Sequence, residues 1–202
     1  MRNLFQRENQ NLISIVSASL FELVIGGCAF LIGWICGINP LGLFQWSWFD
    51  AVLGIGVAVG MVLVLIGLIY CEHRKTLNFI RDTKKLLQRM IFGWGPIEFC
   101  IISLSAGIGE ELFFRGLIQS GLTDLLGGWL GVFIASIAFG MVHWLNNYYF
   151  ICASIMGAFL GFLYQYTGNL LVPIICHTVY DFLVLLLFYW KFKFLKVDKS
   201  QE

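Results

Sequence analysis

Six apolar stretches of this 202-residue chain are each long enough to cross a lipid bilayer as a helix. Of all residues, 59% are hydrophobic and only 12% are charged, too few polar side chains to cover a water-facing domain of this size. Because backbone polar groups inside a bilayer must be satisfied within the chain, the predicted fold is an all-α polytopic membrane protein with about six transmembrane helices. We expect one integral membrane domain over residues 1–202. The expected spans are roughly 12–37, 51–71, 97–119, 129–146, 149–166 and 170–190.

The basic residues indicate how these spans are oriented. Lys and Arg occur before the first span, after the second and after the sixth, whereas the connections 38–50, 120–128 and 167–169 contain none. Since basic residues favour the cytoplasmic side, the pattern predicts that both termini are cytoplasmic. The net charge is only +1, so there is no electrostatic reason to expect nucleic acid as a partner.

The segment 72–95 differs from the spans. Its apolar residues recur at helical spacing with basic residues between them, which is typical of an amphipathic helix lying on the cytoplasmic membrane surface. The alternative is a solvated basic loop. The apolar positions are Leu77, Ile80, Leu87, Met90, Ile91 and Trp94.

Few ionisable side chains fall inside the predicted spans. Of thirteen Lys and Arg residues, Arg115 is the one within a span. A charged group in hydrocarbon costs on the order of 3 kcal/mol or more, so such side chains must face one another, water or a substrate. The sequence assigns no role to one of them, Glu22. The others are Glu110, Glu111, Asp181, His143 and His177.

The two adjacent carboxylates in the third span are expected to have different roles. Glu111 and Arg115 are one helical turn apart, so they can pair on one face of the helix. Glu110 lies about 100° around the helix from Glu111 and has no opposite charge on its own face. We therefore expect Glu111 to be structural and Glu110 to be available for chemistry.

The third and fourth spans are expected to fold back on each other at Gly127. Glu110 lies 17 residues before Gly127 and His143 lies 16 residues after it, so an antiparallel hairpin brings them to nearly the same depth. In the sixth span, His177 and Asp181 are one turn apart on one face. These polar groups from three helices can converge within the membrane.

Such a cluster is suited to hydrolysis of a carbonyl derivative. A buried carboxylate beside an imidazole can abstract a proton from water. A histidine that is oriented by a carboxylate can donate a hydrogen bond to a developing oxyanion.

Three short motifs resemble those of a known family. Residues 110–115 read EELFFR, residues 139–143 read FGMVH and residues 177–181 read HTVYD. They are similar, in order and spacing, to the EExxxR, FxxxH and HxxxN or HxxxD motifs of the CAAX-protease and bacteriocin-processing (CPBP) family of intramembrane glutamic endopeptidases. The resemblance covers about residues 95–190, which are thus expected to be the catalytic core.

The resemblance implies a role for each matching residue. Glu110 and His143 would activate the attacking water, and His177 with Asp181 would stabilise the oxyanion. Supporting roles would fall to Glu111, Arg115 and Phe139. The implied activity is cleavage of a membrane-associated protein or peptide, with or without a lipid, as in CAAX processing or in bacteriocin maturation and immunity. The implied location is a prokaryotic plasma membrane, and no cofactor is expected.

The residue at position 181 departs from one branch of this family. The CAAX-processing branch has Asn at the last position of the third motif, whereas this chain has Asp181. An ionised Asp accepts hydrogen bonds only, so it would orient His177 and favour its protonated form rather than donate to an oxyanion. The departure questions a CAAX substrate more than it questions hydrolysis.

Three alternatives stay open at the level of sequence. Zinc bound by Glu110, His143, His177 and Asp181 is one, although there is no HExxH motif. A proton-coupled transporter is another, since intramembrane acids and histidines also build proton pathways. The third is a noncatalytic immunity or scaffold protein that keeps the polar cluster as a structural core.

Overall fold

Every element in the described part of the chain is a helix, which confirms the predicted all-α class. The computed structural model describes residues 2–70 and 93–198, with side chains for residues 11–70 and 93–190. The predicted amphipathic helix over 72–95 lies almost wholly outside the described residues. In chain order the elements are α1 (Arg2–Cys36), η1 (Pro40–Leu43), α2 (Trp48–Tyr70), α4 (Pro96–Glu111), η2 (Leu112–Gln119), α5 (Ser120–Leu126), α6 (Gly128–Val142), α7 (Asn147–Thr167) and α8 (Leu171–Asp198).

Four of the described helices are long and apolar enough to cross a membrane, rather than the six expected. They are Asn11–Cys36 within α1, Trp48–Tyr70, Asn147–Thr167 and Leu171–Trp190 within α8. The predicted fourth span is the shorter apolar helix Gly128–Val142. The predicted third span is divided between α4, which has three acidic residues, and the π-helix η2. Its ionisable residues, which suggested a site, are also the reason that this segment is less apolar.

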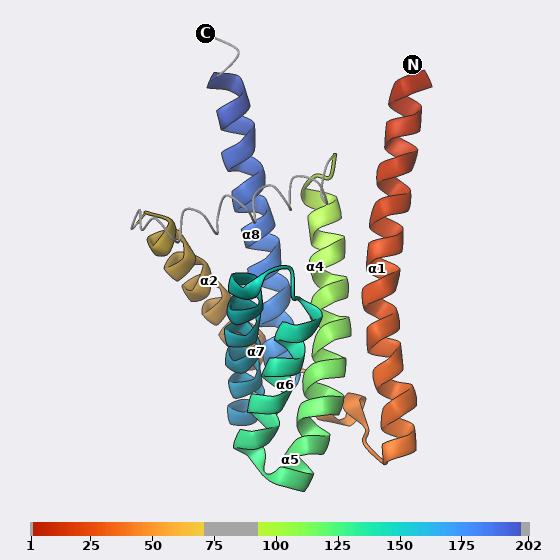
Figure 1. Cartoon of the computed structure of the whole chain (residues 1–202), viewed down its shortest axis with the longest axis vertical. Coiled ribbons are helices and arrows are strands. Elements are labelled where there is room, and N and C mark those ends of the chain that lie inside the picture. The colour runs from red at the N-terminus through yellow and green to blue at the C-terminus, as the bar shows by residue number, and fades with distance from the viewer. Residues whose placement is uncertain (1, 71–92, 199–202) are drawn as a thin grey trace.

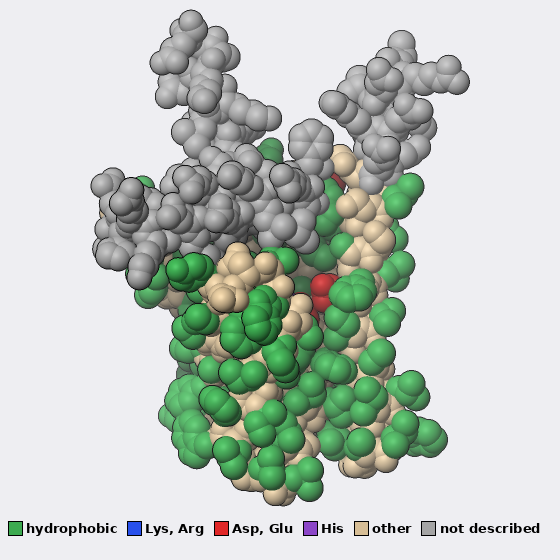
Figure 2. All heavy atoms as spheres, in the orientation of Figure 1, with side chains coloured by type: hydrophobic (Ala, Val, Ile, Leu, Met, Phe, Trp, Pro, Cys, Tyr) green, Lys and Arg blue, Asp and Glu red, His purple; other side chains and the backbone are tan. Residues whose placement is uncertain are grey.

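The outer surface of the bundle is apolar, as expected for a protein that faces lipid. Figure 2 shows hydrophobic side chains over most of the visible face of the described helices. Large side chains such as Trp34, Phe49 and Trp129 are more than two-thirds exposed. Contiguous apolar surface of this extent is rare on soluble monomers and is typical of an interaction with membrane or protein.

Helix α4 lies between α1 and α8, and this position makes it the centre of the bundle. It packs against both of these helices, while α2 packs against α8 and α6 packs against α7 (Figure 1). The first residues of α1 and the last residues of α8 lie at the same end of the molecule, and α5 lies at the opposite end. Side chains on α4 can therefore meet partners from several helices.

The ends of α4 and α6 are set by local sequence. Pro96 opens α4, and the carboxylate of Glu98 accepts a hydrogen bond of 2.8 Å from the backbone N–H of Gly95. Gly127, with φ of 90°, makes the turn between α5 and α6 at the position where the sequence predicts it. Helix α6 ends at Val142, so His143 is the first residue after it.

The connections at the α5 end are joined by the buried side chain of Asn169. Its Nδ2 donates to the carbonyl of Gln45 and to Oδ2 of Asp50, both at 2.7 Å. Its Oδ1 accepts from the backbone N–H groups of Gln45 and Leu171, at 3.0 and 3.1 Å. Asn169 thus fixes the α1–α2 connection to the start of α8.

Candidate active site

The π-helix η2 positions two buried polar side chains against α7. Nη2 of Arg115 donates to the carbonyl of Gly157 at 2.8 Å, and Nε2 of Gln119 donates to the carbonyl of Gly161 at 2.9 Å. Both side chains are almost completely buried. Two donors four residues apart therefore meet two carbonyls four residues apart. Segments of π-helix inside longer helices are frequent at functional sites.

Glu111 is the central acceptor of this cluster. Its Oε1 accepts a hydrogen bond of 2.8 Å from Nη1 of Arg115, as the one-turn spacing predicts. The same oxygen lies 2.8 Å from Nδ1 of His177 on α8, a contact that spacing within one helix does not predict. All three side chains are buried. Glu111 thus holds the third and the sixth predicted spans together.

His177 also lies beside Asp181, as its one-turn spacing predicts. Its Nε2 is 3.4 Å from Oδ2 of Asp181, one turn further along α8. The Asp181 side chain is 35% exposed, whereas the His177 side chain is only 5% exposed. The imidazole is therefore placed between a buried carboxylate, Glu111, and one that is accessible from outside.

Glu110 and His143 face each other, as the hairpin geometry predicts. Oε1 of Glu110 lies 3.6 Å from Nε2 of His143, which is too far for a direct hydrogen bond but within reach of a bridging water. Nδ1 of His143 lies 2.8 Å from the carbonyl oxygen of Phe139. A carbonyl can only accept, so Nδ1 carries a proton, and in the neutral imidazole Nε2 is an acceptor.

The ring of Phe139 supports three of these groups. It stacks under His143 with ring centroids 4.5 Å apart, and it meets His177 edge to face at 5.9 Å. The guanidinium carbon of Arg115 lies 4.7 Å from the ring centroid. Phe139 is buried, so one apolar side chain sets the positions of two imidazoles and a guanidinium.

Glu22 on α1 belongs to the same neighbourhood, although the sequence assigns it no role. Its backbone carbonyl lies against Gly109, the residue before Glu110 on α4. Figure 2 shows acidic side-chain atoms in a hollow beside α1, about midway along the molecule. The signal available in the sequence is that Glu22 is the single acidic residue within the first predicted span.

Zinc bound by the polar cluster is one of the alternatives that the sequence leaves open. The described residues contain no group of three or more His, Cys, Asp or Glu side chains arranged to hold a metal ion.

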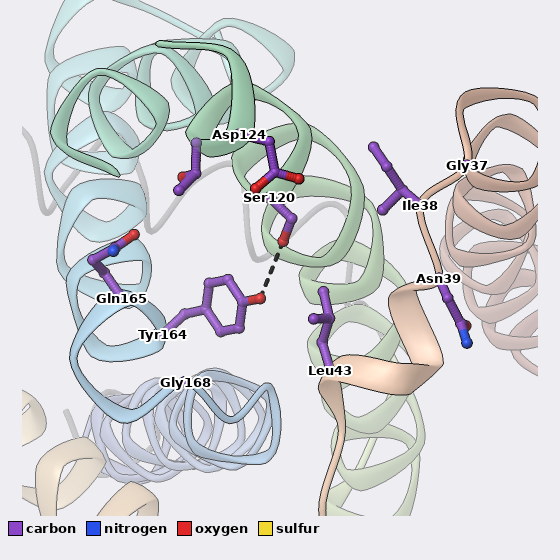
Figure 3. Close-up of a pocket in the computed structure, with 10 residues that line it drawn as sticks. Gly37, Ile38, Asn39, Leu43, Ser120, Asp124, Tyr164, Gln165 and Gly168 are labelled. Atoms are coloured by element: carbon purple, nitrogen blue, oxygen red, sulfur yellow. Dashed lines mark hydrogen bonds between the residues drawn. The ribbon is translucent and has the colours of Figure 1, made fainter. Parts of the chain in front are cut away.

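A cavity of about 340 Å³ lies elsewhere, at the α5 end of the molecule. In Figure 3 the α1–α2 connection, α5 and the end of α7 surround it, and Ser120 and Tyr164 are joined by a hydrogen bond of 3.1 Å. None of the predicted site residues lines it. Its lining consists of Gly37, Ile38, Asn39, Leu43, Ser120, Thr123, Asp124, Tyr164, Gln165 and Gly168.

Comparison with known proteins agrees with the motifs. Residues 92–183 match the model of the family described as type II CAAX prenyl endopeptidase Rce1-like, and this range includes all seven predicted site residues. The chain is 30% identical over 99 residues to the uncharacterized protein YpbD of Bacillus subtilis (strain 168). The aligned stretch covers 47% of this chain and 48% of YpbD. The chain thus spans about half the length of this curated relative. No solved structure matches it. Over residues 92–183, the chain is thus similar to the Rce1-like family of type II CAAX prenyl endopeptidases.

Proposed function

We propose that this protein is an intramembrane endopeptidase that hydrolyses a peptide bond with a water activated by Glu110 and His143. The observation that carries the proposal is the gap of 3.6 Å between Oε1 of Glu110 and Nε2 of His143. Both atoms are acceptors, so a water between them donates one hydrogen to each and directs a lone pair outward. That lone pair is positioned to attack a carbonyl carbon.

In this proposal Glu110 is the general base. The water oxygen forms a bond to the scissile carbonyl carbon while Glu110 takes a proton from the water. The tetrahedral intermediate then breaks its C–N bond, and the proton on Glu110 passes to the leaving amine. His143 keeps the water in place, and its Nδ1–H remains bonded to the carbonyl of Phe139.

His177 is proposed to stabilise the oxyanion. Nδ1–H of His177 donates to Glu111, which leaves Nε2 as the group that can face the substrate. The separation of 3.4 Å between Nε2 and Asp181 is longer than a strong hydrogen bond. When His177 is doubly protonated, its Nε2–H can therefore donate a hydrogen bond to the oxyanion in place of Asp181. Asp181 then offsets the charge of the imidazolium.

The substrate that fits this site is a membrane-associated protein or peptide. The acidic and imidazole groups lie within a bundle whose outside is apolar, and His143 and Asp181 are partly exposed, so a chain that partitions into the membrane can reach the edge of the site at these two residues. Residues 95–190 form the catalytic core in this proposal, inside a single domain over 1–202. The family match does not favour the transporter alternative.

The test compares protein ends in cells that carry the parent chain with cells that carry Glu110→Gln. We expect new N-termini that appear with the parent and are absent with the variant. Glu98→Gln is the matched control, because it makes the same change on the same helix at a residue that only caps it. Identical sets of protein ends in parent and Glu110→Gln cells would contradict the proposal. A farnesylated and an unmodified CAAX peptide, offered to the purified protein, then show whether the lipid is required.

A further inference from the structure

Glu22 brings an acidic side chain from α1 to the site, from outside the segment that matches the family. It precedes residues 92–183 by 70 positions, yet its backbone carbonyl lies against Gly109, the residue before Glu110. No other acidic residue lies in the part of α1 that can span a membrane. A second carboxyl group beside the proposed base requires a physical account, because carboxyl groups are costly within a membrane.

The backbones of α1 and α4 fix this neighbourhood. A Cβ atom on Gly109 would overlap the carbonyl oxygen of Glu22, and a Cβ atom on Gly26 would lie 3.0 Å from Cα of Gly109. The two helices thus touch through their backbones at the residue that precedes Glu110. Glu22 is held beside Glu110 by this crossing and not by a flexible loop.

One oxygen atom of each of the two carboxyl groups lacks a hydrogen-bond partner. Oε2 of Glu22 and Oε2 of Glu110 are both buried and have no hydrogen-bond partner among the described residues. Two ionised carboxylates in contact repel each other strongly in a medium of low dielectric constant. A single proton shared by the pair removes the repulsion and supplies a donor to an oxygen that otherwise has none.

We propose that Glu22 is a positioning residue for Glu110: it holds the proton of the pair and donates a hydrogen bond to Glu110. The donated bond fixes the rotation of the Glu110 carboxylate, so that Oε1 stays directed at Nε2 of His143 and at the water between them. Glu22 touches neither the water nor the substrate. This inference rests on the proposed function, since it concerns the orientation of the proposed base.

The decisive comparison is between Glu22→Gln and Glu22→Leu in the purified full-length protein. An amide retains a donor of the same length, whereas a leucine fills the space without one. For a farnesylated CAAX peptide we expect Glu22→Gln to keep kcat within about threefold of the parent and Glu22→Leu to lower kcat about tenfold or more, with KM little changed. Ser19→Ala is the control on the same helix face, because its buried hydroxyl has no partner among the described residues and lies outside the site. If Glu22 served only to fill space, the kcat of Glu22→Leu would be close to that of the parent.

Two kinetic results would overturn the inference: a Glu22→Leu variant with parental kcat, or a Glu22→Gln variant as impaired as Glu22→Leu. Infrared spectroscopy decides the matter without turnover. The parent should show the carbonyl stretch of a protonated carboxyl group, and Glu22→Gln should lack it. If the parent has no such band, Glu22 does not hold the proton. The infrared measurement does not depend on turnover, so it still tests the inference if Glu22→Leu fails to fold or if the parent cleaves no peptide. A parent that cleaves no peptide would refute the proposed function, and the infrared band would test the role of Glu22 independently.

Discussion

Oε1 of Glu111 accepts a hydrogen bond from Arg115 and also lies 2.8 Å from Nδ1 of His177. One buried oxygen thus joins a guanidinium on the π-helix to an imidazole on α8. Arg115 in turn donates to the carbonyl of Gly157 on α7. The chain of contacts means that Glu111 has two tasks, which are to neutralise Arg115 and to orient His177. These tasks can be separated by mutation.

Replacement of either member of the Glu111–Arg115 pair should destabilise the protein. Each single change leaves an uncompensated buried charge, for which the expected cost is about 3–5 kcal/mol. Glu111→Ala should in addition lower kcat more than Arg115→Ala does, because Glu111 is the residue that bonds to Nδ1 of His177. Thermal unfolding in detergent measures the first effect, and turnover at a temperature where both variants are folded measures the second. Equal kcat in the two variants would count against an orienting role for Glu111.

His143→Ala should lower kcat by at least about a hundredfold, because the attacking water loses one of the two acceptors that hold it in the geometry of the reaction. The side chain contacts Phe139 and faces Glu110 but is 29% exposed, so its loss should have little effect on stability. Turnover and thermal unfolding of the same preparation check both statements. A variant that is stable and still turns over at the parental rate would show that the water is not held between Glu110 and His143.

Asp181→Asn and Asp181→Ala should differ. The asparagine retains an oxygen near Nε2 of His177 and adds a donor, so we expect it to keep kcat within about tenfold of the parent. The alanine variant removes the partner of His177, so its kcat should be lower. We expect the activation free energy to rise by about 1.5–3 kcal/mol, the value of one hydrogen bond to a charged group. Steady-state kinetics of the three proteins on one peptide make the comparison. Should alanine outperform asparagine, Asp181 would not be acting through His177.

Gly109→Ala should weaken the contact between α1 and α4. The added methyl group would overlap the carbonyl oxygen of Glu22, and overpacking of this kind costs about 1–3 kcal/mol. The control is Gly27→Ala on α1, where an added Cβ meets no atom within 4 Å. The two variants carry the same chemical change in helices that touch. Chemical or thermal unfolding should therefore separate them clearly, and equal stabilities would contradict the close crossing.

Much of the site follows from regular helical spacing. The Glu111–Arg115 pair needs only a separation of one turn, and the approach of Glu110 to His143 needs only similar residue counts on either side of Gly127. The fold class follows from hydropathy in the same direct way.

Other features require information that spacing within one helix does not contain. The contact of His177 with Glu111 depends on how α4 and α8 cross, and the place of Glu22 beside Glu110 on how closely α1 approaches Gly109. The π-helix depends on the match between Arg115, Gln119 and two carbonyls of α7, so the regular helix expected for the third span was wrong at its C-terminal end.

The π-helix also makes the structure of this segment depend on its exact number of residues. Single-turn π segments are held by i→i+5 hydrogen bonds, one residue more per ring than in an α-helix. Deletion of one residue between Leu112 and Arg115 would favour a return to α-helical winding and would reduce the separation of Glu111 and Arg115 from four residues to three, so the two side chains would no longer be in register. The region should therefore accept many substitutions but no insertion or deletion, and a family of related chains should be gapless there even where its sequences diverge.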